Sequence, residues 1–259
     1  MNFIDTHTHI DGEEFKDDLD QVIQRAKDAG ATKLFIPAID FASVDRIRTI
    51  CDRYPDYCYG MIGLHPEEVT SLSPSPYLPF TSPLPPHIIG IGEIGLDFYW
   101  SREYEKEQLE VFEEQVKWSV ELQLPLMIHC RKAQNEMVRI LRKYEGKLCG
   151  GVFHCFTGNA LEAKELLSFE GFCLGIGGVL TFKKSNLPQT LAEAVPLERI
   201  VLETDAPYMA PVPHRGERNE SSYITHIIDR LAEVYHKTPD EIGDITTQNV
   251  KRTFPLAFT

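Results

Sequence analysis

The sequence contains no long apolar run. No stretch approaches the ~18 uninterrupted apolar residues that a membrane-crossing helix requires. The start of the chain also differs from a secretory signal, because Asp5, His7 and His9 interrupt its apolar residues. We therefore expect a cytoplasmic protein with no membrane contact.

Cysteine pairs and an excess of positive charge are also missing. The six cysteines show no C-x-x-C spacing and most lie among apolar residues, which indicates reduced core thiols rather than a zinc knuckle or a disulfide framework. The chain carries 39 acidic and 26 basic residues, a net charge of −13. This balance excludes the broad basic surface with which proteins grip duplex DNA through counterion release. Any contact with nucleic acid must therefore be local.

Short apolar runs alternate with amphipathic stretches along almost the whole chain. The runs predict eight strands, the first starting at Phe3 and the others at residues 33–39, 59–64, 88–93, 126–129, 151–154, 172–175 and 200–205. The amphipathic stretches predict helices at residues 17–29, 44–53, 104–122, 135–144, 160–168, 187–194, 223–235 and 239–254. Such alternation over about 250 residues is typical of an α/β (β/α)8 barrel of the TIM type. A doubly wound open sheet is the alternative, but no glycine-rich phosphate loop follows the first strand.

One segment, residues 71–86, departs from this alternation. It contains six prolines, and prolines at that density remove the amide donors that a helix needs. We predict a loop on the rim of the barrel. A disordered linker between two domains is the alternative, which is disfavoured because strands and helices resume unchanged beyond it. We therefore expect one domain over residues 1–259, whose 42% hydrophobic content suffices for one large core.

The first predicted strand ends in a His-x-His pair, His7 and His9. Alternate residues of a strand share one face, so both imidazoles should point the same way. Two imidazoles on one face form half of a site for a divalent metal ion. A pair of ordinary polar residues at a strand end is the alternative interpretation.

Further metal-binding side chains recur at the ends of later predicted strands. Glu93 ends the fourth strand, His129 the fifth, His154 the sixth and Asp205 the eighth. The C-terminal ends of barrel strands converge at one mouth. Four imidazoles and two carboxylates gathered there match the ligands of two divalent ions that share a bridging carboxylate.

Seven short motifs follow one another along the chain. They are Phe-Ile-Asp-Thr-His-Thr-His at residues 3–9, Gly-Leu-His-Pro at 63–66, Gly-Glu-Ile-Gly-Leu-Asp at 92–97, Pro-Leu-Met-Ile-His at 125–129 with Arg131, His-Cys-Phe-Thr-Gly at 154–158, Leu-Glu-Thr-Asp-Ala-Pro-Tyr at 202–208 and Pro-His-Arg-Gly-Glu-Arg-Asn-Glu at 213–220. In content and order, the set resembles that of the TatD family of metal-dependent deoxyribonucleases, which are amidohydrolase-type barrels. The resemblance extends over the whole chain.

The resemblance implies that two divalent ions are cofactors. Glu93 would bridge them, with the first ion bound by His7, His9 and Asp205 and the second by His129 and His154. The resemblance suggests Mg²⁺, whereas imidazole ligands suit Zn²⁺ or Mn²⁺ better because they are softer.

The resemblance also suggests residues that act on the substrate. Asp205 is the candidate for the base that takes a proton from the attacking water, and Glu93 and His65 are further catalytic candidates. Four side chains on mouth loops are candidates for holding phosphate oxygens, with ordinary solvated residues as the alternative: His65, Arg131, Arg215 and Asn219. We expect Glu203 to orient its neighbours from one layer deeper, and Asp97 to be a solvated loop residue.

The chain departs from the family pattern at several positions. Glu67 replaces a second histidine after the Gly-x-His-Pro turn, Lys132 replaces an acidic residue after His-x-Arg, and Ser221 replaces a proline after Arg-Asn-Glu. The proline-rich segment 71–86 replaces a helix. None of these changes removes a metal ligand, and we expect all of them to touch the rim around the substrate.

The predicted activity is metal-dependent hydrolysis of phosphodiester bonds in DNA. Positive charge near the mouth is limited to the ions and a few loop residues, which suits the end of a single strand better than a duplex: Arg131, Lys132, Arg215 and Arg218. We therefore predict exonuclease-like cutting of single-stranded DNA, with no obligate protein partner. One alternative is hydrolysis of a small amide, ester or phosphate substrate, although many such barrels bridge their ions with a carboxylated lysine where Glu93 stands. A binding protein without activity is the other alternative, disfavoured because all six ligands are intact.

Overall fold

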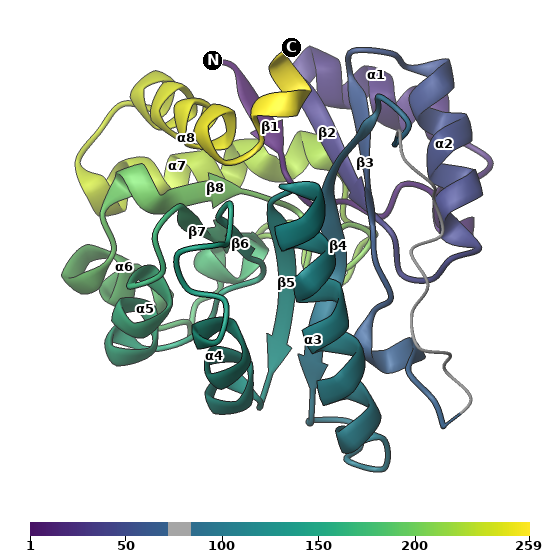
Figure 1. Cartoon of the computed structure of the whole chain (residues 1–259). Coiled ribbons are helices and arrows are strands. Elements are labelled where there is room, and N and C mark those ends of the chain that lie inside the picture. Colours follow the sequence, from purple (N-terminus) through teal and green to yellow (C-terminus); the bar gives the residue numbers. More distant parts are fainter. Residues whose placement is uncertain (72–83) are drawn as a thin grey trace.

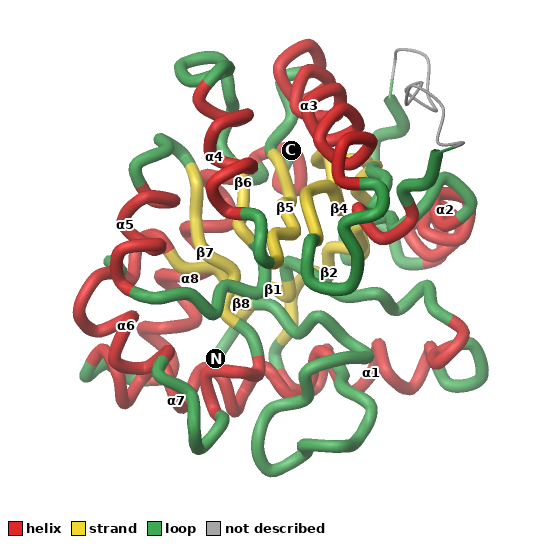
Figure 2. Tube along the Cα trace, turned by 90° about the horizontal axis from the view of Figure 1, so that it is seen from below, coloured by secondary structure: helices red, strands yellow, loops and turns green. Residues whose placement is uncertain are grey.

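Eight parallel strands form a single sheet in chain order in the computed structural model, which describes residues 1–71 and 84–259. The strands are β1 (Phe3–Asp5), β2 (Ala31–Pro37), β3 (Cys58–Ile62), β4 (Ile88–Asp97), β5 (Leu126–Arg131), β6 (Gly151–Phe153), β7 (Phe172–Ile176) and β8 (Ile200–Leu202). Helices surround the strands, as Figure 1 shows from the side and Figure 2 from the C-terminal ends of the strands. The predicted (β/α)8 barrel is confirmed.

The helices begin and end within two residues of their predicted positions. They are α1 (Leu19–Ala29), α2 (Ser43–Arg53), α3 (Glu105–Leu122), α4 (Gln134–Arg142), α5 (Ala160–Leu167), α6 (Leu187–Ala194), α7 (Ile224–Tyr235) and α8 (Pro239–Thr253). Between β3 and β4, the described residues form one 3₁₀ turn, η2 (Pro66–Glu68), and no α-helix. Most of the predicted rim loop at 71–86 lies outside the described residues.

Backbone hydrogen bonds close the sheet into a barrel between its first and last strands. The Thr6 amide donates to the Leu202 carbonyl at 3.0 Å, the Asp205 amide to the His7 carbonyl at 2.9 Å and the His9 amide to the Ala206 carbonyl at 2.8 Å. In an open doubly wound sheet the first and last strands would remain unpaired. The hydrogen bonds between them therefore exclude that alternative.

The apolar core has two layers, inside and outside the barrel. The inner layer includes Phe35, Met61 and Met127 of the strands, with Val250 and Phe254 from the end of α8. Helix α8 lies across the N-terminal ends of the strands (Figure 1). A larger layer packs the outward faces of the strands against the surrounding helices. Apolar residues thus fill the barrel toward the N-terminal ends of its strands, and the buried polar residues His7, His9, Glu93 and His154 lie toward the opposite mouth.

Several predicted strand ends are wrong, and the corrections at β1, β4 and β8 matter most for the site. The ladder of β1 with β2 ends at Asp5, and the backbone of His7 and His9 pairs instead with the segment after β8. Strand β8 ends at Leu202, before Asp205. Glu93 lies inside β4, at a point where β4 has one residue more than β5: Ile91 pairs with Leu126, and Ile94 with Ile128. A β-bulge of this kind redirects a side chain, and here it turns Glu93 into the barrel.

None of the described helices combines the length and apolar character that crossing a bilayer requires. All six cysteines are free thiols, and three of them are buried: Cys51, Cys58 and Cys173.

Candidate metal centre

The carboxylate of Glu93 lies at the centre of a buried polar cluster at the barrel mouth. Its Oε2 atom lies 3.1 Å from His7 Nε2 and 3.4 Å from His9 Nε2. Its Oε1 atom lies 3.1 Å from His129 Nδ1 and 2.9 Å from His154 Nε2. The two oxygens therefore face two different pairs of imidazoles, which is what a carboxylate that bridges two ions requires.

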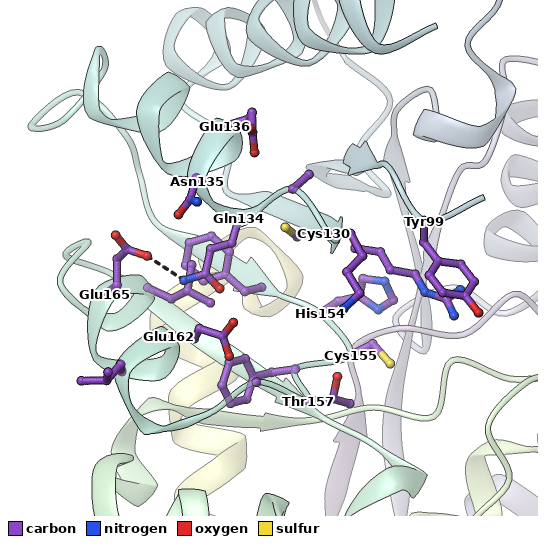
Figure 3. Close-up of a pocket in the computed structure, with 18 residues that line it drawn as sticks. Tyr99, Cys130, Gln134, Asn135, Glu136, His154, Cys155, Thr157, Glu162 and Glu165 are labelled. Carbon is purple, nitrogen blue, oxygen red and sulfur yellow. Dashed lines mark hydrogen bonds between the residues drawn. The ribbon is translucent and has the colours of Figure 1, made fainter. Parts of the chain in front are cut away.

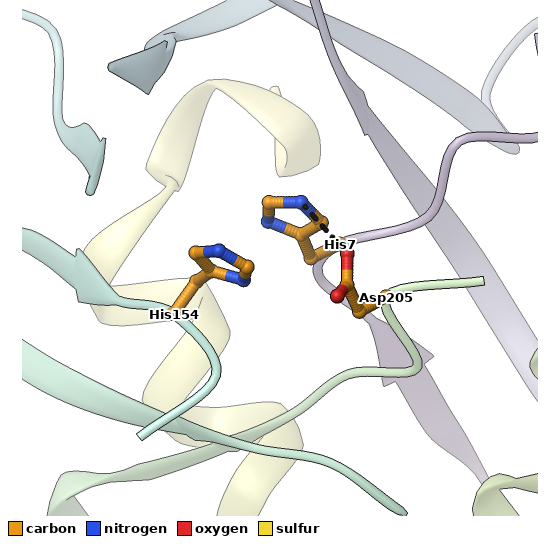
Figure 4. A group of neighbouring side chains, drawn as sticks. All are labelled: His7, His154 and Asp205. Carbon is orange, nitrogen blue, oxygen red and sulfur yellow. Dashed lines mark ion pairs between the residues drawn. The ribbon is translucent and has the colours of Figure 1, made fainter. Parts of the chain in front are cut away.

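Asp205 completes the side of the cluster that Glu93 Oε2 faces. Its Oδ1 atom lies 3.7 Å from His7 Nε2 and 3.6 Å from His9 Nε2, and these two nitrogens are 3.1 Å apart. Figure 4 shows His7 between Asp205 and His154. The rings of His7 and His154 stack with centroids 4.0 Å apart. Side chains that follow β1, β6 and β8 thus meet at one point.

The charges of the cluster stabilise one another. Burial acts to raise the pKa of Glu93, but the charges of His154 and the other imidazoles outweigh it and hold that pKa well below its usual range. Burial acts to lower the pKa of His9, but hydrogen bonds to Asp205 and Glu93 raise it to about 10. The hydrogen bond from His9 likewise lowers the pKa of Asp205 against the effect of burial. Protons on imidazoles therefore supply, in the metal-free chain, positive charge that a bound cation would replace.

The residues of the cluster fit a divalent metal ion. Three groups of side chains each place their ligand atoms within 4.8 Å of one another: His7, His9 and Glu93; His7, His154 and Asp205; His65, Glu93 and His129. The buried Nδ1 atoms of His7, His9 and His154 have no hydrogen-bond partner among the described residues, so hydrogen bonds at Nδ1 do not hold these rings in place. Imidazole nitrogens and carboxylate oxygens are the ligands that zinc and manganese take in proteins.

His65 also approaches the cluster, and its Nδ1 atom is engaged by a backbone hydrogen bond. Its Nδ1 accepts a hydrogen bond from the Glu67 amide at 3.2 Å, which places its proton on Nε2. That Nε2 lies 3.2 Å from Glu93 Oε1. In this arrangement His65 donates a hydrogen bond toward Glu93 at the edge of the cluster.

Asp97 is part of the site, and the expectation that it is a solvated loop residue is wrong. Strand β4 continues to Asp97, whose side chain is buried. Its Oδ2 lies 2.9 Å from His129 Nε2, the nitrogen opposite the one that faces Glu93. A carboxylate behind a ligating histidine fixes the orientation of the ring and makes it a stronger ligand. The close approach of β4 and β5 here requires Gly95, which has φ +148° and whose Cβ would lie 1.8 Å from the His129 carbonyl oxygen.

Glu203 makes contacts that fit the predicted orienting role. Its side chain is fully buried. Its Oε1 accepts a hydrogen bond from the Cys155 amide and lies 3.7 Å from His154 Nδ1. It also packs against Gly175, where a Cβ would lie 2.0 Å from Glu203 Oε2. Glu203 thus holds the backbone that carries His154.

Asp5 was not among the predicted site residues, although its hydrogen bonds hold segments that carry residues of the cluster. Its fully buried carboxylate accepts hydrogen bonds from the Thr204 amide at 3.0 Å, the Thr204 hydroxyl at 2.7 Å, the Ser221 hydroxyl at 2.6 Å and the His7 amide at 3.3 Å. Burial outweighs these bonds and raises the pKa of Asp5 to about 7. The expectation that Ser221 touches the substrate rim is wrong, because this residue is fully buried against Asp5.

We expect Asp5→Ala to lower the free energy of unfolding by at least about 4 kcal/mol. The substitution leaves four buried donors without an acceptor, and each unsatisfied group costs about 1–3 kcal/mol. Urea unfolding of the chelator-treated protein measures this effect without a contribution from metal binding. Asp52→Ala, on the exposed face of α2, is the matched control, and equal effects of the two substitutions would contradict the supporting role of Asp5.

The predicted phosphate-binding residues differ in their surroundings. Asn219 is fully buried, and its Nδ2 donates to the carbonyls of Thr204 and Tyr208 at 2.8 and 2.7 Å. Because both amide hydrogens are used, the predicted phosphate contact of Asn219 has no free donor, and the residue braces the loop after β8 instead. Arg215 is exposed on that loop, with its guanidinium carbon 4.1 Å from the centre of the Phe182 ring.

Two further basic residues, Arg218 and Arg131, differ in whether their charge is paired. Arg218 forms a two-bond ion pair with Asp18, at 2.8 and 2.7 Å, so its charge is already neutralised. Arg131 is exposed at the end of β5. The mouth therefore has fewer unpaired basic side chains than the sequence suggested, because Arg218 is already paired with Asp18.

A pocket of about 780 Å³ adjoins the cluster. Its lining includes His154, Arg131 and Lys132, and Figure 3 shows His154 and Tyr99 toward one end and Glu162 and Glu165 toward the other. The volume lies in the range of small-molecule sites, about 300–1,000 Å³. Arg131 and Lys132 thus line the same pocket as His154, a residue of the cluster.

Comparison with known proteins yields matches over nearly the whole chain. A model of the family described as "TatD related DNase" matches residues 4–255. The "Uncharacterized metal-dependent hydrolase YabD" of Bacillus subtilis is 36% identical over 254 residues, 97% of this chain and 98% of that protein. The "3'-5' ssDNA/RNA exonuclease TatD" of Pectobacterium parmentieri is 31% identical over 262 residues, 98% of this chain and 99% of that protein. A solved structure, of the TatD homologue YJJV from Escherichia coli, superposes with a TM-score of 0.85 at 28% identity and covers 98% of each chain.

Proposed function

Because this chain belongs to the TatD-related DNases, a family of metal-dependent hydrolases, we propose that it removes nucleotides from the ends of single-stranded DNA by hydrolysing phosphodiester bonds. The observation that carries the proposal is the position of Glu93, whose two carboxylate oxygens face separate imidazole pairs. The relative in Pectobacterium parmentieri is named a 3'-5' exonuclease. We propose the same polarity here.

Two divalent ions would be held on either side of Glu93. The first would be bound by His7, His9 and Asp205, and the second by His129 and His154. When bound, such ions activate the attacking water and neutralise the charge that develops on the phosphate oxygens. The imidazole ligands favour Zn²⁺ or Mn²⁺, with Mg²⁺ as the other candidate.

The side chains of the mouth supply the remaining chemistry. Asp205 is ionised, since its pKa is lowered, and its carboxylate can take a proton from the attacking water. His65 carries its proton on Nε2 and can donate it in a hydrogen bond to a phosphate oxygen. Arg131 at the end of β5 and Arg215 on the loop after β8 are exposed, and their guanidinium groups can bind phosphates of the strand.

The proposed activity is tested by comparing substrates with and without a chelator. A labelled single-stranded oligonucleotide, a small aryl ester and a small cyclic amide are each incubated with the protein and Mn²⁺. We expect release of mononucleotides from the oligonucleotide alone, and none once the chelator is added. Metal-dependent cleavage of the ester or the amide alone would support the small-substrate hydrolase instead. Absence of all cleavage would support a binding protein.

Cutting should depend on a free strand end. We expect a circular single strand to survive conditions that degrade a linear strand of the same sequence, because the few free cations of the mouth can neutralise only a few phosphates. With about two to four contacts, log affinity should fall against log salt with a slope of roughly −1.4 to −2.8. Gel analysis of both strands, with affinity titrated against salt, measures the two effects. Equal loss of the circle, or a slope steeper than about −5, would contradict end-directed binding.

A further inference from the structure

Two aromatic side chains, Tyr99 and Trp100, lie exposed at the barrel mouth directly after β4. Tyr99 is 50% exposed and Trp100 is 66% exposed. Burial of an aromatic ring is favourable in proportion to its apolar area, so the fold gains little from rings left in water. The other tryptophan, Trp118, is 4% exposed and packs in the core, as expected for this residue type.

Tyr99, Trp100 and Arg131 form one ordered surface, here called the aromatic platform. The rings of Tyr99 and Trp100 meet edge to face with centroids 4.9 Å apart. The guanidinium carbon of Arg131 lies 3.7 Å from the centre of the Tyr99 ring and 5.1 Å from that of Trp100. Cation–π and aromatic contacts of this kind order the side chains before a ligand arrives, which reduces the entropy lost on binding.

The charge of Arg131 is free, unlike that of most arginines that lie over rings in this chain. Four such arginines also pair with carboxylates: Arg53, Arg102, Arg142 and Arg218. Arg131 makes no ion pair with any residue in the described part of the chain. The platform therefore offers aromatic faces beside an unneutralised cation, which are the two groups that bind a base and its phosphate in single-stranded nucleic acid.

Asp97 fixes the platform relative to the metal centre. One carboxylate oxygen, Oδ2, lies 2.9 Å from His129 Nε2. The other, Oδ1, accepts hydrogen bonds from the amides of Tyr99 at 2.8 Å and Trp100 at 3.4 Å. Arg131 lies two residues beyond His129 on β5, on the same face and about 6.5 Å further along the strand. The platform is thus built on the two strands that carry Glu93 and His129.

We propose that the aromatic platform stacks a base of the single-stranded substrate and so holds the strand end at the metal centre. The inference rests on the proposed function and adds how the strand is gripped. Every base has a π-face, so stacking on Trp100 would be tolerant of sequence. A duplex keeps its bases stacked on each other, so the platform would also select single strands.

The fluorescence of Trp100 provides a direct measurement of stacking. The Mg²⁺-loaded protein is titrated with a single strand of about eight nucleotides whose phosphorothioate linkages resist cutting. We expect quenching from Trp100, whereas the buried Trp118 contributes a constant background. Trp100→Ala should weaken binding about 5- to 140-fold, which corresponds to the loss of one stacked base, and Trp100→Phe should retain most of the affinity. Leu256→Ala, which removes an exposed apolar side chain far along the chain in η6 (Pro255–Phe258), should leave binding unchanged.

An abasic strand separates stacking from other roles of Trp100. A strand of equal length with abasic sugars at its 3' end keeps the phosphates but lacks the rings. Trp100→Ala should weaken binding of the intact strand and leave binding of the abasic strand unchanged. Equal weakening of both strands, or absence of quenching at saturation, would overturn the platform. The cleavage assay tests the proposed function separately. If the protein cuts normal strands but Trp100→Ala does not weaken their binding, only the platform is refuted. If the protein cuts no strand, the proposed function is refuted.

Discussion

Glu93→Ala is expected to abolish hydrolysis while leaving the protein folded. Removal of a single group that stabilises a transition state costs about 10²–10³-fold in kcat, and Glu93 would contribute to both metal sites, so we expect a loss beyond about 10³-fold. The side chain is buried in the polar cluster and belongs to neither apolar layer. Circular dichroism and a thermal melt should therefore show a folded variant.

A control and a conservative variant sharpen this prediction. Glu110→Ala, on the exposed face of α3, should retain full activity. Glu93→Gln keeps the shape of the side chain but loses the charge shared by the two imidazole groups, so its activity should be close to that of the alanine variant. Near-normal turnover in either Glu93 variant would contradict the bridging role.

Substitutions on the two sides of Glu93 should each remove one metal ion. His154→Ala takes a ligand from the Oε1 side and His9→Ala takes one from the Oε2 side. We expect about two ions per chain in the unaltered protein and about one in each variant, because the ligands of the other side stay in place. Metal analysis after dialysis against Mn²⁺ measures the ratio.

His214→Ala is the matched control for these histidine variants. His214 lies on the loop after β8, stacked on Tyr223, and pairs with Glu217 rather than with the cluster. It should leave the metal content unchanged. A content of two ions in both His154→Ala and His9→Ala would show that the ions bind elsewhere.

The pattern of apolar residues was sufficient to predict the barrel and to single out side chains that the fold brings together in the candidate metal centre. Strand and helix periods place the elements, and polar residues after apolar strands stand out because a strand buried on both faces rarely carries them. Strand ends were harder to predict. Glu93 was placed at the end of a strand, whereas the strand continues through Gly95 to Asp97.

Residues that act through packing could not be distinguished from solvated residues by pattern alone. Asn219 and Ser221 follow a loop rich in charged residues, and only the fold shows that both side chains are buried. Asp97 carried one usable signal: with Gly95, it continues the two-residue alternation from Glu93. The burial of Asp5 depends on Thr204 and Ser221, which are about 200 residues away in the chain.

The most direct test of the two-ion centre is an anomalous-diffraction map of crystals grown with Mn²⁺. We expect two peaks, one on the side of Glu93 Oε2 among His7, His9 and Asp205 and one on the side of Oε1 between His129 and His154. A single peak, or a peak among Glu67, Asp97 and His129, which also place ligand atoms within 4.8 Å of one another, would contradict the bridging carboxylate.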